Sequence, residues 1–145
     1  MGWLVASSGK KATATVAKGS DLVLVDSSGW VEFLGDGPLA EKFAPYFERE
    51  ERLIVPAIVL YEVYKKLLSA QGSTAADRFL SAALRARVMP LDERLALLAA
   101  RISLDLRLAM ADAMIYATAQ AAGALLVTSD THFRGLTGVT VIGAE

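Results

Sequence analysis

Short apolar runs alternate along this chain with longer segments of helical periodicity. The runs that predict strands lie at residues 22–25, 53–55, 88–91, 124–127 and 139–142. Runs of this length are typical of strands buried on both faces, as in a parallel sheet. Segments that predict helices begin at Ser27 and then cover residues 39–50, 57–70, 74–86, 92–107 and 111–122. Strands that alternate with helices predict an α/β fold with a mostly parallel sheet.

The first 20 residues differ in composition from the rest of the chain. They are rich in Ala, Ser, Thr, Gly and Lys, contain no acid and show no sustained period. Their lysines follow the short apolar patch at the start instead of preceding it, which argues against a signal peptide. We interpret residues 1–20 as a flexible arm or an added leader, and residues 21–145 as one domain.

Composition narrows the chemistry that this chain can perform. The 145 residues include no cysteine, which excludes disulfides, thiolate zinc sites and cysteine nucleophiles and fits a reducing compartment such as the cytoplasm. One histidine, His132, excludes the two-histidine HExxH zinc site. With 15 basic and 16 acidic residues, no global basic field favours nucleic acid, so RNA binding would have to be local or metal-assisted.

Residues 108–127 are nearly free of charge and about as long as a membrane span. Asp112 lies within this stretch, and an acid in a bilayer is costly. The stretch also divides at Gly123 into a helix and a short strand. We therefore expect a buried helix and a buried strand here, and no membrane association.

Two predicted strands end in the same way, with an acid directly after an apolar run. These acids are Asp26 and Asp130. Ligand sites in open parallel sheets lie beyond the carboxyl ends of the strands, so both acids are expected at one edge. Each alone is also typical of an ordinary helix cap or turn.

Two further acids, Glu62 and Asp112, lie among apolar residues on predicted helices. Burial of a carboxylate is unfavourable unless the group is paired, bound to a metal or neutralised. Glu62 has an alternative role in an exposed pair with Lys66, and Asp112 has one as a helix N-cap.

Four acids near one edge would repel one another unless a cation lies between them. Mg²⁺ prefers oxygen ligands, often a few carboxylates together with substrate phosphate oxygens. Such an ion reverses the local charge, activates a water and supports attack on a phosphodiester. This chemistry needs neither histidine nor cysteine.

The segments VDSSGWVEFL, PAIVLYEVYKKL, ADAMIYATAQAAGALLVTSD and VTVI resemble PIN-domain ribonucleases of the VapC toxin type over about residues 21–145. The resemblance implies a three-layer PIN-like sandwich with a four- or five-stranded sheet. It also implies a Mg²⁺- or Mn²⁺-dependent endoribonuclease, a homodimer, and neutralisation by a co-expressed antitoxin. The metal-binding, catalytic acids that it implies are Asp26, Glu62, Asp112 and Asp130.

The same resemblance implies that two hydroxyls, those of Ser28 and Thr128, support the metal site. Two features depart from the family pattern. The 20-residue arm precedes the first strand, and Thr131-His132-Phe133 follows Asp130 where many relatives carry another acid. The second departure bears on a fifth, auxiliary metal ligand.

Other residues have both functional and ordinary interpretations. Lys65, Lys66 and Arg134 are candidate RNA contacts, but each also suits a solvated surface. Exposure to solvent is the simpler expectation for His132. Core or dimer packing is the simpler expectation for four aromatic residues that could otherwise stack on bases, namely Trp30, Tyr61, Tyr64 and Tyr116.

Two other classes of function compete with the nuclease. An aspartyl-phosphate phosphatase or receiver domain also places an acid after its first strand. Such phosphatases require a second Asp two residues later, where this chain has Ser28. Receivers require a lysine after a late strand, and none follows Val127 or Ile142. A non-catalytic PIN-like interaction module is the third class, although all four acids are present.

Overall fold

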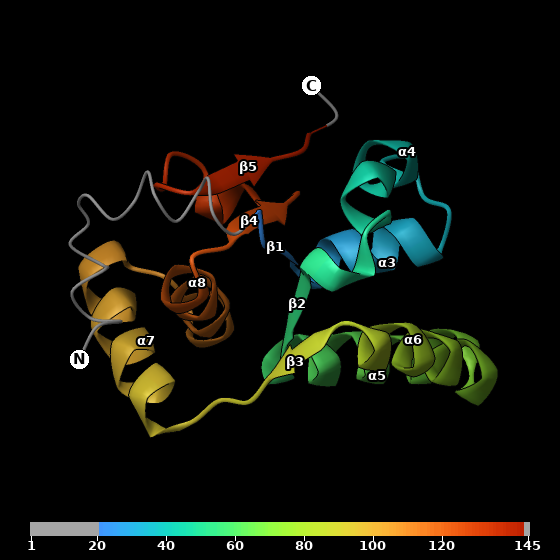
Figure 1. The fold of residues 1–145 in the computed structure, drawn as a ribbon, viewed down its shortest axis with the longest axis horizontal. Coiled ribbons are helices and arrows are strands. Elements are labelled where there is room, and N and C mark those ends of the chain that lie inside the picture. The colour runs from blue at the N-terminus through green and yellow to red at the C-terminus, as the bar shows by residue number, and fades with distance from the viewer. Residues whose placement is uncertain (1–20, 144–145) are drawn as a thin grey trace.

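The computed structural model describes residues 21–143, which form one parallel sheet with helices on both sides (Figure 1). The interpretation of residues 1–20 lies outside these described residues. Five strands lie in the order β3-β2-β1-β4-β5, and every neighbouring pair is parallel. The strands are β1 (Val23–Val25), β2 (Leu53–Pro56), β3 (Arg87–Met89), β4 (Leu125–Thr128) and β5 (Val139–Val141). The predicted α/β sandwich with a four- or five-stranded sheet is confirmed, with five strands.

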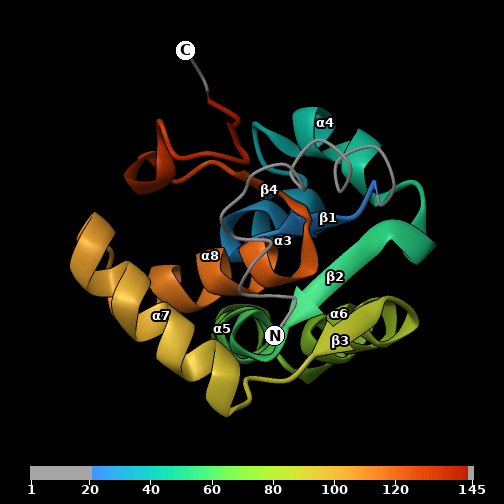
Figure 2. The ribbon, with the colours of Figure 1, turned by 60° about the vertical axis from the view of Figure 1, so that its left-hand side comes forward.

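Six α-helices connect the strands within residues 21–143. They are α3 (Ser27–Leu34), α4 (Ala40–Phe43), α5 (Ala57–Gln71), α6 (Ser73–Arg85), α7 (Glu93–Leu106) and α8 (Met110–Ala122). In the view of Figure 1, α7 and α8 lie to the left of β1 and β2, while α3, α4 and α6 lie to the right. Helix α7 packs along α8 in both views (Figure 2). This two-sided cover is what right-handed crossovers produce when the strand order reverses direction.

The three central strands are buried on both faces, as their continuous apolar runs predict. Leu24 and Val25 of β1, and Ile54 and Val55 of β2, have no solvent exposure. An aromatic cluster fills the space beside them, with Trp30 edge-on to Phe79 at 5.2 Å between ring centroids. Such pairs stabilise beyond the area that they bury.

The predicted helix over residues 39–50 is wrong in its extent. The chain forms the short helix α4, then a 3₁₀ turn over Ala44–Phe47, and a second 3₁₀ turn over Glu50–Arg52. Pro45 explains the break, because proline has no backbone N–H and its ring clashes with the carbonyl four residues earlier. The other predicted helices and strands occur, with ends shifted by one or two residues.

Residues 108–127 form helix α8 and strand β4 as predicted, joined by Gly123 in the left-handed conformation. None of the helices in the described part of the chain is long and apolar enough to cross a membrane.

The strand order reverses between β1 and β4, which defines the edge where a ligand site is expected. The chain moves outward from β1 through β2 to β3, then returns to place β4 against the other side of β1. Val25 is in register with Val127, and the Asp26 amide donates to the Val127 carbonyl at 3.1 Å. Asp26 and the residues after Thr128 therefore emerge together at the carboxyl edge of the sheet.

Candidate metal centre

Asp26 is the buried acid of the site and also the N-cap of α3. Its side chain accepts a hydrogen bond from the Gly29 amide at 3.3 Å, so the cap interpretation is correct. The residue is 5% exposed, however, and two hydroxyls donate to its carboxylate. A surface cap needs neither this burial nor these hydroxyls.

The two hydroxyls are those of Ser28 and Thr128. Ser28 Oγ donates to Asp26 Oδ1 at 2.6 Å and accepts from the Ser129 amide at 3.2 Å. Thr128 Oγ1 donates to Asp26 Oδ2 at 2.7 Å and accepts from the Asp130 amide at 2.9 Å. Both hydroxyls therefore join the end of β1 to the loop after β4, which fixes Asp26 relative to Asp130.

Glu62 extends from α5 toward the same edge. Ser27 Oγ donates to Glu62 Oε1 at 2.5 Å, which links the first residue of α3 to α5. In the described part of the chain, Glu62 forms no ion pair with Lys66, so the alternative of an exposed helix pair is wrong. Ser27 contacts a candidate site residue and was not identified from the sequence; the only signal was its position beside Asp26.

Asp112 lies in the first turn of α8, which has Ala109 as its N-cap, so the N-cap interpretation of Asp112 is wrong. Asp112 Oδ2 lies 3.6 Å from His132 Nδ1, and Asp130 Oδ1 lies 3.2 Å from the same nitrogen. Asp112, Asp130 and His132 offer ligand atoms that all lie within 4.8 Å of one another. They form a group that could hold a metal ion.

The electrostatics of the site penalise its negative charge. Burial raises the pKa of Asp26, although the Ser28 and Thr128 hydroxyls and the Gly29 amide oppose this, and the charge of Asp130 raises it further. Burial also raises the pKa of Asp112, and Asp130 and Glu62 add to this increase against the opposing effect of His132. The carboxylates thus influence one another across the edge of the sheet.

The set of donors fits a hard divalent cation. In residues 21–143, no Lys or Arg forms an ion pair with Asp26, Glu62, Asp112 or Asp130, and only the exposed His132 approaches two of them. Buried charges without a cationic partner are unfavourable. A bound cation would remove that cost, and carboxylate oxygens are ligands that Mg²⁺ and Mn²⁺ accept.

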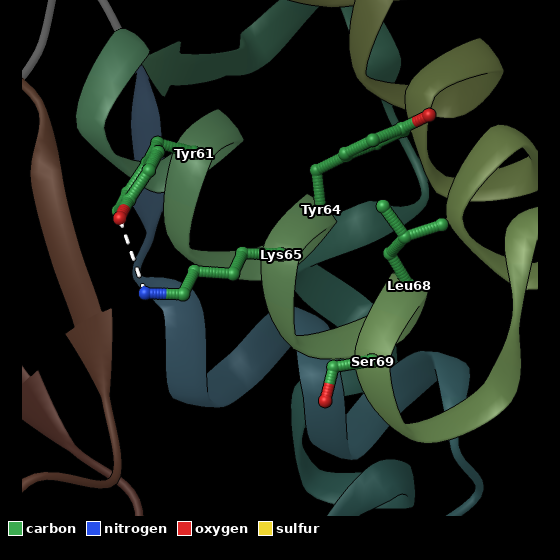
Figure 3. Close-up of a pocket in the computed structure, with 5 residues that line it drawn as sticks. All are labelled: Tyr61, Tyr64, Lys65, Leu68 and Ser69. Carbon is green, nitrogen blue, oxygen red and sulfur yellow. Dashed lines mark hydrogen bonds between the residues drawn. The ribbon is translucent and has the colours of Figure 1, made fainter.

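The basic candidates lie outside this cluster. Lys65 donates to the Tyr61 hydroxyl at 3.2 Å on the outer side of α5 (Figure 3). Lys66 and Arg134 are exposed and, within the described residues, pair with none of the four acids. A hollow of about 450 Å³ on α5 is lined by none of the acids, but by Tyr61, Tyr64, Lys65, Leu68 and Ser69.

Most of the aromatic candidates have structural roles, as expected. Trp30 is in the core, and the buried Tyr116 donates its hydroxyl to the Thr137 carbonyl at 2.8 Å. Tyr64 donates to Asp77 at 3.2 Å. Tyr61 remains exposed, on the outer side of α5.

Comparison with known proteins identifies the family to which this chain belongs. The family model described as "PIN domain" matches residues 23–138, and the chain therefore belongs to the PIN-domain family.

Solved structures of VapC toxins have the same fold. A toxin–antitoxin complex from Klebsiella pneumoniae has a chain with a TM-score of 0.72 and 20% identity, covering 82% of this chain and 96% of that one. VapC20 from Mycobacterium tuberculosis, described as a sarcin–ricin loop cleaving toxin, has a TM-score of 0.68 and 19% identity, covering 82% and 98%. DNA-bound VapBC from Salmonella typhimurium has a TM-score of 0.62 and 20% identity, covering 84% and 97%. Among curated proteins, none matches this chain.

Proposed function

We propose that this protein is a divalent-metal-dependent endoribonuclease and the toxin of a toxin–antitoxin pair. The observation that carries the proposal is the group of Asp112, Asp130 and His132, whose ligand atoms lie within 4.8 Å of one another. Asp26 and Glu62 lie outside that group, but the charge of Asp130 acts on Asp26 and that of Glu62 on Asp112, and no Lys or Arg within residues 21–143 pairs with any of the four acids. PIN-family membership and the likeness to VapC toxins support the same function.

The proposed chemistry assigns a distinct task to each group. The four carboxylates would hold Mg²⁺ or Mn²⁺, which supplies an activated water and charge to offset the phosphodiester. Thr128 and Ser28 orient Asp26 by donating to its two oxygens, and Ser27 orients Glu62. Lys65, Lys66 and Arg134 are our candidates for contacts to RNA phosphates, because they are exposed and not paired with the acids.

An RNA cleavage assay with and without EDTA tests the proposal. We expect the wild type to cut RNA internally with Mg²⁺ or Mn²⁺, and EDTA to abolish cleavage. Asp26→Asn should abolish it as well, since Asn keeps the cap of α3 but is a poorer ligand. Phosphate release from a small ester would instead support the aspartyl-phosphate alternative. Metal binding without any cleavage would support a non-catalytic module.

We also propose that a cognate antitoxin inserts a basic side chain among the four acids. An arginine can replace the charge of the metal and form two parallel bonds to a carboxylate. Structural neighbours of this chain were crystallised with antitoxins, which supports a partner of this kind. The purified complex should bind Mn²⁺ much more weakly than the free toxin. Equal Mn²⁺ affinity in the two samples would exclude this mode of inhibition.

We further propose a homodimer, in which two negative sites align along one RNA groove. Support comes from α7, where Leu97 and Leu104 are 68% and 82% exposed and lie seven residues apart on one side of the helix. Light scattering should report a dimer at micromolar concentration. Leu104→Glu should dissociate it, whereas Leu84→Glu, at a 60% exposed leucine of α6, should not. A wild-type monomer would refute the proposal.

A further inference from the structure

The only histidine of the chain lies against two of the four acids. His132 Nδ1 is 3.2 Å from Asp130 Oδ1 and 3.6 Å from Asp112 Oδ2. The imidazole is 75% exposed, so an ion pair with these acids would add little to stability. Its position therefore calls for a reason other than stabilisation of the fold.

The local fold directs this side chain toward the acids. Asp130 caps the 3₁₀ turn η3 (Thr131–Phe133) by accepting from the His132 amide at 2.8 Å. Phe133, the next residue, has no solvent exposure and anchors the turn in the core. The cap at Asp130 and the buried Phe133 thus fix the backbone of His132, and its ring lies beside the carboxylate that caps its own turn.

The spacing of the three ligand atoms suits one ion. Adjacent ligands on an octahedral ion lie about 3 Å apart when each is ~2.1 Å from the metal. The two distances from Nδ1 to the carboxylate oxygens are close to this spacing.

We propose that His132 Nδ1 is a direct ligand of the ion that Asp112 and Asp130 bind, and that it shifts the preference of the site from Mg²⁺ toward Mn²⁺ and later first-row ions. Mg²⁺ strongly prefers oxygen ligands, whereas first-row transition ions accept imidazole nitrogen. This inference rests on the proposed metal site and adds a nitrogen ligand to it.

Pulsed electron paramagnetic resonance of Mn²⁺ bound to the tag-free, full-length protein tests the ligand directly. Coordinated imidazole produces ¹⁴N modulation of the Mn²⁺ signal. Because the chain contains one histidine, such modulation can come only from His132. We expect it in the wild type and its absence in His132→Ala. Bound Mn²⁺ without ¹⁴N modulation in the wild type would overturn the inference.

Calorimetric titration with Mn²⁺ alone and with Mg²⁺ alone gives a second test. For His132→Ala we expect Mn²⁺ affinity to fall at least about tenfold, because losing even a group that only hydrogen-bonds to a metal ligand typically costs about 10–100-fold in affinity, and we expect Mg²⁺ affinity to change much less. His132→Asp should strengthen Mg²⁺ binding. Thr131→Ala, in the same turn and exposed, is the control and should bind both ions as the wild type does.

The outcomes separate this inference from the proposed function. If His132 merely pairs with the acids, His132→Ala should bind both ions equally well or more tightly, which refutes ligation while the nuclease proposal stands. If the wild type binds neither Mn²⁺ nor Mg²⁺, the metal site itself fails, and the proposed function fails with it.

Discussion

Asp112→Asn should change activity and stability in opposite directions. The substitution keeps the shape of the side chain and removes one negative charge from a site where Asp112 and Asp130 are only 20% and 32% exposed. A neutral amide is a poorer Mg²⁺ ligand, so RNA cleavage should fall by orders of magnitude. In EDTA, the same change relieves repulsion among the acids and should stabilise the protein.

The gain in stability can be sized from the structure. The ligand atoms of Asp112 and Asp130 lie within 4.8 Å of each other. Two like charges at that distance repel by about 3.5 kcal/mol at an effective dielectric constant of 20. Solvent and the nearby His132 reduce this to roughly 1–2 kcal/mol. For a domain of this size, that corresponds to a rise in Tm of roughly 2–8 °C.

Added metal should reverse the order of the two proteins. Wild type gains about 2.7 kcal/mol when free metal is about 100 times its Kd, whereas the variant gains less. Thermal unfolding curves in EDTA and in Mg²⁺, measured beside an RNA cleavage assay, report both effects. Asp105→Asn, at an exposed acid of α7, is the matched control and should show the same small change in both buffers. Cleavage by the variant at the wild-type rate would show that Asp112 is not a metal ligand. The same order of the two Tm values in EDTA and in Mg²⁺ would show this as well.

Three further predictions follow from particular contacts. The pKa values of Asp26 and Asp112 are raised in the folded state, so the metal-free folded protein binds protons at a higher pH than the unfolded chain does. Its Tm in EDTA should therefore rise as pH falls from 7 toward about 5. A Tm that falls over this range would contradict the direction of the two pKa shifts. Ser27→Ala should weaken Mn²⁺ binding measured by calorimetry and Ser27→Thr should restore it, because the hydroxyl holds Glu62; wild-type binding by Ser27→Ala would show that this hydrogen bond does not organise the site. Gly29→Ala should destabilise the fold by roughly 1–3 kcal/mol in chemical denaturation, since a Cβ would lie 2.4 Å from Val25 Cγ1 and 2.6 Å from Phe43; an unchanged unfolding midpoint would show that the core can accommodate the methyl group.

Sequence alone determined the class of fold and the edge at which the acids meet. Runs such as residues 22–25 are apolar at every position, which only a strand covered on both faces requires, and this implies a parallel sheet. Asp26 and Asp130 each follow such a run, so parallel topology brings them to one edge without further information. Local chemistry also located most of the helices, and the helix predicted over 39–50 failed only where Pro45 interrupts it.

Tertiary structure decided which side chains touch across that edge. Ser27 and Glu62 are 35 residues apart, and Thr128 and Asp26 are 102 apart, so no local pattern reports that these pairs form hydrogen bonds. His132 illustrates the same limit: a polar residue in a loop reads as solvent-exposed, and it is, yet its ring lies beside Asp112 of a different helix. Periodicity reports which face of an element is buried. The distances between groups on separate elements depend instead on how the helices pack on the sheet, which is settled by the whole core at once.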